Sequence, residues 1–370
     1  MAMPATMEAG VSPFFSGSYA SDDVTILLKP TEIATVATDE KERLIQSGAK
    51  HYSEMLSAEK LPDDRYMALY REALSRNAGR LRGDIATLGR AIAARPSTAR
   101  ECVIVSLARA GTPIGVLLKR ALSRLDVTTH HYSISIIRDR GIDRNALRFI
   151  KARHGTGSTV FVDGWTGKGA IKTELRRSVA EADLGFSPFL AVIADPAGCA
   201  DLAATTEDYL IPSGLLNGIV SGLISRSVLR DDLVGPDDFH ACLYQIEHAE
   251  HDLTQQFLRD VEEAAPPEMN APPWSPERSA EARLCSRALI EQLKRDFGIG
   301  DVNRIKPGIA EATRAVLRRV PELLLVRDRR DPEIQHLLHL ASTSGVPVNE
   351  YDLHAYRAVT VIKSLGGSQE

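Results

Sequence analysis

The chain has 370 residues, of which 44% are hydrophobic and 25% charged, and its formal net charge is −4. This is the composition of an ordinary globular protein, and the length predicts two or three domains. The apolar runs are too short to span a bilayer and the N-terminal residues lack a secretion signal, so we expect a cytoplasmic protein without a membrane partner. Because the four cysteines lie far apart, we expect neither a disulfide framework nor a structural zinc site.

Helical and strand patterns alternate along the first two thirds of the chain. Residues 38–94 place charged and apolar positions at helical spacing, which predicts two or three amphipathic helices. From residue 101 onward, β-branched runs such as CVIVSLA alternate with helical patterns such as GTPIGVLLKRAL. This alternation predicts βαβ units and a parallel sheet, in which ligands bind at the carboxyl ends of the strands.

A proline-rich segment separates this region from the C-terminal part. Residues 264–282 contain five prolines, which predicts a linker, and residues 283–370 show a second alternation of helical and strand patterns. We therefore expect a main domain over residues 1–263 with an N-terminal helical region, the linker, and a small α/β domain over residues 283–370.

The segment VFVDGWTGKGAI places an acid, a glycine-rich turn and a helix start directly after a buried strand. A helix N-terminus offers unpaired N–H groups and the positive end of its dipole, and glycines let the backbone approach a phosphate closely. Thr166 adds a hydroxyl and Lys168 a charge, while the Asp163 carboxylate suits ribose hydroxyls or Mg²⁺. By itself the segment fits an anion site and an ordinary strand–helix turn equally well.

The same segment resembles the ribose-phosphate-binding motif of type I phosphoribosyltransferases. On this resemblance Asp163 matches the first of the family's two acids, and it is the residue expected to hold Mg²⁺ as cofactor. The loop that holds the 5-phosphate corresponds to Thr166, Gly167, Lys168, Gly169 and Ala170. Gly164 stands where the second acid is usual, so one contact to the ribose hydroxyls is missing or comes from elsewhere.

Two further segments resemble parts of the same family. VSLARAGTPIG resembles the pyrophosphate loop, which implies that Arg109 and the amides around Ala110 and Gly111 face pyrophosphate. HYSISIIRDRGID places Arg138 and Arg140 after a strand, where forked hydrogen bonds suit phosphate and where the family has a loop that closes over the site. The alternatives are that Arg109 is a surface charge at a helix start, and that Arg138 and Arg140 belong to a solvated charged loop.

At the scale of the whole chain, FSGSYASDDVTILLK, DGWTGKGAI, DPAG and TTEDYLIPSGLLNGIVSGL occur in the order of one bacterial family. The chain resembles the StiP family, which is found with tellurite-resistance and stress genes and is called a cysteine protease. That family has also been viewed as a phosphoribosyltransferase-like domain joined to a Pelota-type RNA-binding domain. For proteolysis, Cys199 and Cys242 are poor candidates, and Leu215 stands where the family often has cysteine.

The segment KPGIAEATR resembles the K-x-G-x-N-E-x-T-K motif of Pelota-type domains and kink-turn-binding ribosomal proteins. The matching residues are Lys306, Gly308, Glu311, Thr313 and Arg314. Ala310 stands where the base-contacting Asn is usual. Eight basic residues against three acids between positions 304 and 330, Arg318 among them, form a basic patch that suits an RNA backbone, with a solvated helix face as the alternative.

Two segments before the linker read as helices. IPSGLLNGIVSGLISRSVL has small residues at every fourth position, which predicts a helix stripe for a helix–helix or homodimer contact rather than membrane insertion. FHACLYQIEHAEHD places His248 and His251 three residues apart, as a partly exposed polar helix or part of a metal site.

These observations predict a phosphoribosyltransferase-like enzyme that acts at the anomeric carbon of phosphoribosyl pyrophosphate or a nucleotide and carries an RNA-binding domain. Asp163 would hold ribose hydroxyls or Mg²⁺, residues 166–170 the 5-phosphate and Arg109 the pyrophosphate, while Arg138 and Arg140 close the site. A non-catalytic regulator that senses a nucleotide and binds RNA is the alternative, which Gly164 favours, and a cysteine protease is the third reading.

Overall fold

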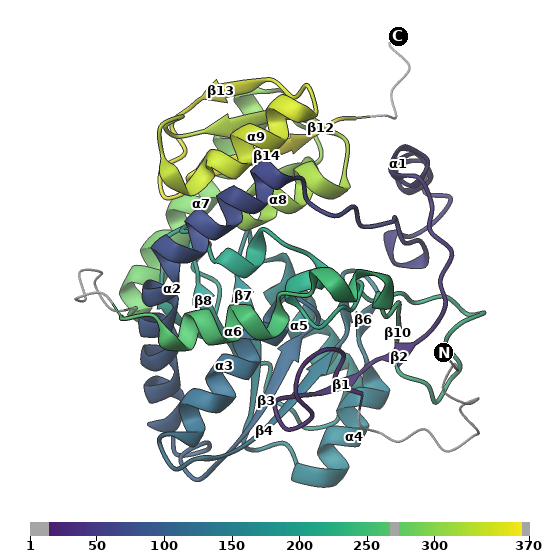
Figure 1. Cartoon of the computed structure of the whole chain (residues 1–370), viewed down its shortest axis with the longest axis vertical. Helices are drawn as coiled ribbons and strands as arrows, with labels where there is room; N and C mark the ends of the chain where they lie inside the picture. The colour runs from purple at the N-terminus through teal and green to yellow at the C-terminus, as the bar shows by residue number, and fades with distance from the viewer. Residues whose placement is uncertain (1–14, 267–273, 365–370) are drawn as a thin grey trace.

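The computed structural model describes residues 15–266 and 274–364 (Figure 1). Within these ranges, six parallel strands form the central sheet of the larger domain, in the order β1–β4–β3–β7–β8–β9. The strands are β1 (Thr25–Leu27), β3 (Glu101–Leu107), β4 (Thr128–Ile134), β7 (Thr159–Trp165), β8 (Leu190–Ala194) and β9 (Leu202–Thr205). The expected α/β class with a parallel sheet is confirmed.

Helices cover both faces of this sheet because its strands bury residues on both sides. Ile104 and Val162 pack in one core with α2 (Asp64–Ala93), α3 (Gly111–Ser123) and α6 (Thr254–Glu263). Val103 and Phe161, their sequence neighbours, pack in a second core with α4 (Arg144–His154) and α5 (Ala170–Ala182). The shorter elements are β2 (Lys29–Pro30), α1 (Thr38–Gln46), η1 (Tyr52–Glu54), β5 (Ile136–Ile137) and β6 (Gly141–Ile142). The helices expected over residues 38–94 are therefore α1 and the long helix α2.

The C-terminal domain begins with α7 (Pro276–Asp296) and contains a mixed sheet in the order β11–β14–β12–β13. In this sheet β14 is antiparallel to both of its neighbours, whereas β12 and β13 are parallel. Its elements are η5 (Val302–Arg304), β11 (Ile305–Pro307), α8 (Ile309–Arg318), β12 (Pro321–Val326), η6 (Pro332–Ile334), α9 (Gln335–Thr343), β13 (Val348–Glu350) and β14 (Ala358–Ile362). The small C-terminal α/β domain is thus present, at the top of Figure 1.

The linker is shorter than the proline content suggested. Helix α7 begins at Pro276, inside the predicted linker 264–282, and residues 267–273 lie outside the described residues. The Ser275 hydroxyl accepts a hydrogen bond from the Arg278 amide at 3.3 Å and so caps the helix. Proline is tolerated in the first helical turn because its missing N–H has no helical partner there, so Pro276 starts the helix rather than preventing it.

The two helices predicted before the linker are wrong. Residues 211–229 contain two short 3₁₀ turns, η2 (Pro212–Gly214) and η3 (Gly218–Val220), and Gly222 and Leu223 adopt positive φ angles of 82° and 56°. A Cβ on Gly222 would lie 2.6 Å from the Tyr19 ring, so this small residue serves packing within the chain and not a helix stripe for a homodimer. The second segment forms β10 (Ala241–Cys242), which pairs with β2, and η4 (Ile246–His251).

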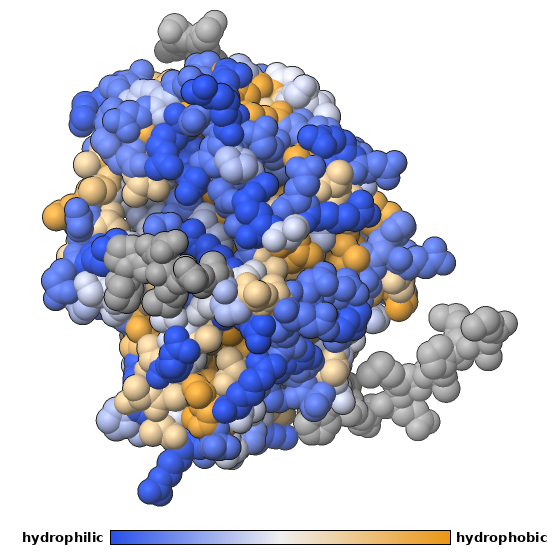
Figure 2. Space-filling view, turned by 60° about the vertical axis from the view of Figure 1, so that its left-hand side comes forward, coloured by the Kyte–Doolittle hydropathy of each residue, from blue (hydrophilic) through white to orange (hydrophobic). Residues whose placement is uncertain are grey.

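The described residues contain no helix that is long and apolar enough to cross a membrane. Figure 2 shows a face on which hydrophilic residues predominate and apolar residues are scattered.

Candidate functional site

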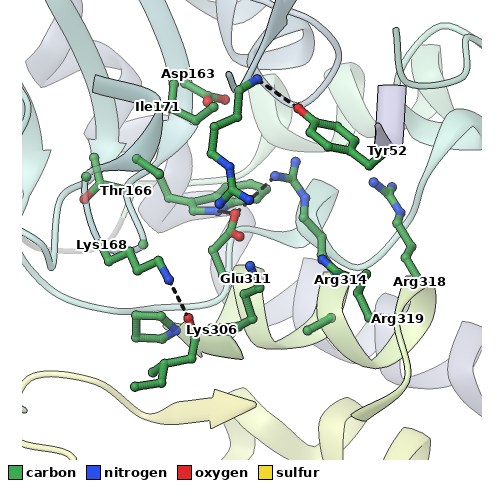
Figure 3. A pocket seen from close by; sticks show the side chains of 18 of the residues that line it. Tyr52, Asp163, Thr166, Lys168, Ile171, Lys306, Glu311, Arg314, Arg318 and Arg319 are labelled. Atoms are coloured by element: carbon green, nitrogen blue, oxygen red, sulfur yellow. Dashed lines mark hydrogen bonds and ion pairs between the residues drawn. The ribbon is translucent and has the colours of Figure 1, made fainter. Parts of the chain in front are cut away.

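The carboxyl end of β7 opens into a cavity between the two domains (Figure 3). The cavity has a volume of about 310 Å³. On one side it is lined by Asp163 and by the turn 166–169 that leads into α5, and on the other by β11 and α8 of the C-terminal domain. The predicted phosphate loop and the predicted RNA-binding motif therefore face the same space.

Two buried carboxylates hold the domains together beside this cavity. Asp208 of the main domain accepts hydrogen bonds from the Ile309 amide at the start of α8, at 3.1 Å, and from the Arg357 amide at 2.9 Å. Glu333 of the C-terminal domain accepts from the Leu210 amide at 2.7 Å and from Asn77 at 2.9 Å. Because buried carboxylates of this kind need their donors, these hydrogen bonds stabilise the closed arrangement of the two domains.

The glycine-rich turn is shaped as much by the C-terminal domain as by α5. Gly169 precedes α5 with a φ of 87°, a conformation that side chains disfavour. A Cβ on Gly167 would lie 2.7 Å from Cγ of Glu311, and Tyr356 donates a hydrogen bond to the Gly167 carbonyl at 2.7 Å. Thr166 donates to Asp195 at 2.6 Å, which anchors the turn to the end of β8. The absence of a side chain at Gly167 thus allows the turn to pack closely against the C-terminal domain.

Cations outnumber acids on the cavity wall. Among the described residues, the wall carries the cations Lys41, Arg138, Lys168, Lys172, Arg226, Lys306, Arg314, Arg318 and Arg319, and the acids Asp163 and Glu311. Four of the cations have acidic partners that do not line the cavity: Lys172 pairs with Asp201, Arg319 with the buried Glu42, Arg138 with Asp139 and Arg318 with Glu59. The remaining charges leave an excess that suits an anionic ligand.

Burial lowers the pKa of several of these cations, and neighbouring cations add to the effect. Burial and then the neighbouring Lys306 lower the pKa of Lys168 to about 7, and its ammonium group donates to the carbonyls of Val302 and Ile305. Burial also lowers the pKa of Lys306 to about 8, with Arg319 and Arg138 adding to the effect. Such shifts mark positive charges that the free protein does not fully neutralise.

The pKa values of two arginines of the cavity wall are lowered in the same way. Burial and Arg109 lower the pKa of Arg318 to about 9, although Glu59 lies 3.9 Å from its guanidinium. Burial lowers the pKa of Arg226 to about 10, with Arg109 and Arg319 contributing. Both guanidinium groups therefore lack full compensation.

The pKa values of the two acids of the cavity are shifted in opposite directions. Burial raises the pKa of Asp163 to about 6, although Arg314 and the Gly164 amide, which donates to it at 2.8 Å, oppose this shift. Burial also opposes ionisation of Glu311, but Arg314 and Lys306 outweigh it and lower its pKa. Glu311 accepts from the Trp165 indole at 3.4 Å, and the Arg314 guanidinium lies 4.4 Å from the centre of the Trp165 ring.

The structure brings most of the predicted site residues together. Those that line the cavity are Asp163, Thr166, Gly167, Lys168, Gly169, Ala170, Arg138, Lys306, Glu311, Arg314 and Arg318. Of the predicted residues, the ones that do not line it are Arg109, Ala110, Gly111, Arg140, Gly308 and Thr313.

The predicted pyrophosphate loop is turned away from the cavity. Arg109 is buried and donates to Glu59 and to the Ile224 carbonyl, so its guanidinium already has acceptors. Gly111 packs against β7, where a Cβ would lie 2.5 Å from the Val162 carbonyl oxygen. The prediction that Arg109, Ala110 and Gly111 face pyrophosphate does not fit this arrangement.

Three other predicted contacts are used within the fold. Arg140 pairs with Glu54 at 2.9 Å. The Thr313 hydroxyl is fully buried and donates to the Ile309 carbonyl at 2.7 Å, so it cannot contact RNA in this structure. Gly308 adopts a φ of 89° at the start of α8, beside Asp208, which is a structural role.

The sequence reasoning missed several cavity residues. Tyr52 accepts a hydrogen bond from the Arg138 amide at 2.8 Å, and Arg226 donates to the Tyr52 carbonyl at 2.6 Å. Lys41 and Trp165 also line the cavity. Tyr52 falls in the region predicted to be helical and lies in η1, and nothing in that pattern indicated that it faces a cavity. The sequence offers Arg226 only as a weak possible ligand contact, and Trp165 lies inside the motif VFVDGWTGKGAI without a predicted role.

The cysteines lack the environment of a nucleophile. Cys102 and Cys242 are fully buried, and burial raises the pKa of each to about 12. Burial and then Asp195 raise the pKa of Cys199 to about 12 as well. Within residues 15–266 and 274–364, no cysteine is hydrogen-bonded to a histidine. The thiolate form that attacks a peptide bond is therefore disfavoured at these three cysteines.

Two family models and a curated protein are similar to this chain. A family model described as "Tellurite-like stress resistance cysteine protease StiP" matches residues 17–262, and a model of the PELOTA RNA binding domain matches residues 284–364. A curated protein of Acinetobacter baylyi, named "Cysteine protease StiP", is 44% identical over 367 residues, which cover 95% of each protein.

Solved structures are similar at a much lower level. A Trypanosoma cruzi hypoxanthine phosphoribosyltransferase in complex with IMP is 14% identical, with a TM-score of 0.25, over 50% of this chain and 93% of that one. A Leishmania tarentolae HGPRT-ase in complex with GMP is 9% identical, with a TM-score of 0.23, over 41% and 85%. Scores this low carry no argument about chemistry. The family model and the curated relative, in contrast, show that the chain belongs to the StiP family.

Proposed function

We propose that the interdomain cavity binds a ribose 5-phosphate ligand, either phosphoribosyl pyrophosphate or a nucleotide, and that the protein acts at its anomeric carbon. The observation that carries this proposal is that a glycine-rich helix N-terminus and an excess of partly buried cations line one cavity of about 310 Å³. A volume of this size suits a small ligand, and lysines with lowered pKa values favour a polyanion, which would restore their charge.

The phosphate is assigned to the start of α5. The backbone N–H groups there have no helical partners, and Lys168 and Lys306 stand beside them. This assignment also rests on the resemblance of residues 160–171 to a ribose-phosphate-binding motif.

Asp163 is the residue that fits Mg²⁺ or the ribose hydroxyls. Its carboxylate lines the cavity and has a pKa of about 6, so it is mostly ionised at neutral pH, and carboxylate oxygen is a ligand that Mg²⁺ prefers. Bound Mg²⁺ would neutralise charge on phosphate oxygens. Arg138, Arg314 and Arg318 line the same cavity and could stabilise a departing anion as the bond at the anomeric carbon breaks and a nucleophile forms the new one.

RNA is the proposed ligand of the C-terminal domain. The match to the PELOTA RNA binding domain and the basic residues Lys306, Arg314 and Arg318 support it. In this conformation, however, those three side chains face the cavity. RNA contact through them therefore requires the two domains to separate.

The relative's name raises proteolysis as a second candidate. The Cys199 thiol lies beside the glycine-rich turn, because a Cβ on Gly169 would lie 3.5 Å from its sulfur. Its raised pKa and the lack of a described histidine partner argue against a cysteine nucleophile. A non-catalytic nucleotide sensor stays the alternative within the proposed ligand class, because Gly164 removes one carboxylate.

Calorimetry with phosphoribosyl pyrophosphate and Mg²⁺ tests the proposal. The wild type should bind, and Asp163→Asn should bind more weakly when Mg²⁺ is present. Arg177→Ala, on the exposed side of α5, is the matched control and should bind like the wild type. A wild type that gives no binding with phosphoribosyl pyrophosphate or any nucleotide tried contradicts the assignment, and binding without turnover across a panel of bases supports the sensor.

A further inference from the structure

A separate group of metal-binding side chains lies at the other end of the parallel strands. Glu101 is the first residue of β3, His130 lies near the start of the adjacent β4, and His154 is the last residue of α4. The interdomain cavity lies at the carboxyl ends of the strands, so this cluster is at the opposite edge of the sheet. One potential ligand atom from each of the three residues lies within 4.8 Å of the other two.

The spacing of these atoms suits one small metal ion. Oε1 of Glu101 lies 3.5 Å from Nδ1 of His154 and 3.8 Å from Nε2 of His130. Two ligands bound tetrahedrally to Zn²⁺ at about 2.1 Å are separated by about 3.4 Å. Small rotations of partly exposed side chains would therefore complete the geometry, and Glu101 and His130 are 47% and 41% exposed. Solvent can then supply the remaining ligand.

A neighbouring tyrosine sets the orientation of one imidazole. The Tyr132 hydroxyl lies 2.8 Å from Nε2 of His154, and the Tyr132 ring packs edge-on against Phe149 at 6.0 Å. When Nε2 of His154 donates its proton to this hydroxyl, Nδ1 presents its lone pair toward Glu101. Metal-binding histidines commonly have such a partner on the second ring nitrogen, which fixes the tautomer and the ring.

We propose that Glu101, His130 and His154 form a binding site for a divalent transition metal ion of the Zn²⁺ type. Two imidazoles and one carboxylate suit Zn²⁺ or Co²⁺, whereas Mg²⁺ prefers oxygen ligands alone. The ion joins the end of α4 to the first residue of β3 and the third residue of β4, and so crosslinks three elements that α3, β5 and β6 separate in the chain. The site is independent of the proposed ribose-phosphate function.

Cobalt titration of the full chain, freed of metal by a chelator, tests this site. The wild type should bind one Co²⁺ at this site and develop the visible absorption of a four- or five-coordinate ion, which Zn²⁺ but not Mg²⁺ displaces. His130→Ala and Glu101→Gln should each weaken Co²⁺ binding at least tenfold. Both side chains are partly exposed, so circular dichroism should show that the variants stay folded.

A matched control is available on the C-terminal domain. His354 lies 3.6 Å from Asp352, which gives a single imidazole–carboxylate pair whose imidazole is about as exposed as that of His130. His354→Asn, a residue that tolerates the positive φ of this position, should leave Co²⁺ binding unchanged. Zn²⁺ should also raise the melting temperature of the wild type and of His354→Asn but not that of His130→Ala. The proposal is overturned if the wild type does not bind Co²⁺, or if His130→Ala and Glu101→Gln bind Co²⁺ as tightly as the wild type.

Discussion

Binding of a phosphorylated ligand in the interdomain cavity should be accompanied by uptake of protons. In the free protein, burial and neighbouring cations lower the pKa of Lys168 to about 7 and that of Lys306 to about 8. At pH 8 about nine tenths of Lys168 and about half of Lys306 are then neutral, and a bound phosphate that restores both charges takes up about 1.4 protons. At pH 6 both lysines are already charged, and these two groups should take up about 0.1 proton.

The same shifts predict how the affinity depends on pH. Because protons are taken up on binding, affinity falls as pH rises through the lowered pKa values. If the ligand raises the pKa of Lys168 by about two units, this lysine alone weakens binding about fiftyfold between pH 6 and pH 9. Asp163 acts in the opposite sense, because its pKa of about 6 means that it loses its charge in more acidic solution. The affinity should therefore be highest near pH 6 to 7.

Calorimetry in two buffers with different protonation enthalpies measures the proton uptake directly. The ligand is phosphoribosyl pyrophosphate with Mg²⁺, and the measurement is made above pH 7, where a phosphate with a second pKa near 6 changes its own charge little. Lys168→Met should bind more weakly and take up about one proton fewer at pH 8. Tight binding without proton uptake by the wild type, or equal uptake by Lys168→Met, would refute the reasoning.

Three further predictions concern the backbone of Gly169, the charges of Arg314 and Arg318, and the Cys199 thiol. Gly169→Ala, at a φ of 87°, should lower the free energy of unfolding by about 1 kcal/mol in urea denaturation, whereas Gly157→Ala, with open space around it and no positive φ, should change it little. The double variant Arg314→Glu, Arg318→Glu should weaken the binding of both phosphoribosyl pyrophosphate and RNA, measured by fluorescence anisotropy. It should also make RNA binding less dependent on salt. An unaltered affinity would mean that these two arginines do not bind the ligands. Cys199, with a pKa near 12, should react with iodoacetamide at pH 8 far more slowly than free cysteine, and fast alkylation would revive the protease.

The strand–turn–helix units could be predicted from sequence because their signals are local. β7 and α5 follow from a β-branched run, a glycine turn and a helical pattern, and Gly169 adopts the conformation that such a turn requires. The helix predicted over residues 211–229 is wrong for the same reason, because a local pattern of small residues at every fourth position also occurs outside helices. Glycine is a poor helix former, however, and the positive φ of Gly222 and Leu223 breaks the chain into turns.

The direction of side chains could not be predicted in the same way. A local motif places Arg109 just after β3. Its guanidinium, however, donates a hydrogen bond to Glu59, 50 residues earlier in the chain, and so points away from the cavity. Likewise, the motif in α8 gave no sign that Lys306, Arg314 and Arg318 face the other domain. That orientation depends on partners distant in sequence, since the amide of Ile309 is held by Asp208, 101 residues earlier.

The shared cavity has a consequence for the two proposed ligands. Lys306, Arg314 and Arg318 line the cavity, and the domains that enclose it are held by the hydrogen bonds of Asp208 and Glu333. On these proposals, RNA would reach those three side chains when these bonds open, whereas a ribose-phosphate ligand in the cavity would contact both domains and favour the closed state. Coupling between two sites is reciprocal, so each ligand must weaken the other's binding by the same factor. RNA affinity should therefore fall as phosphoribosyl pyrophosphate and Mg²⁺ are added, and an RNA affinity independent of both would mean that RNA binds on another surface.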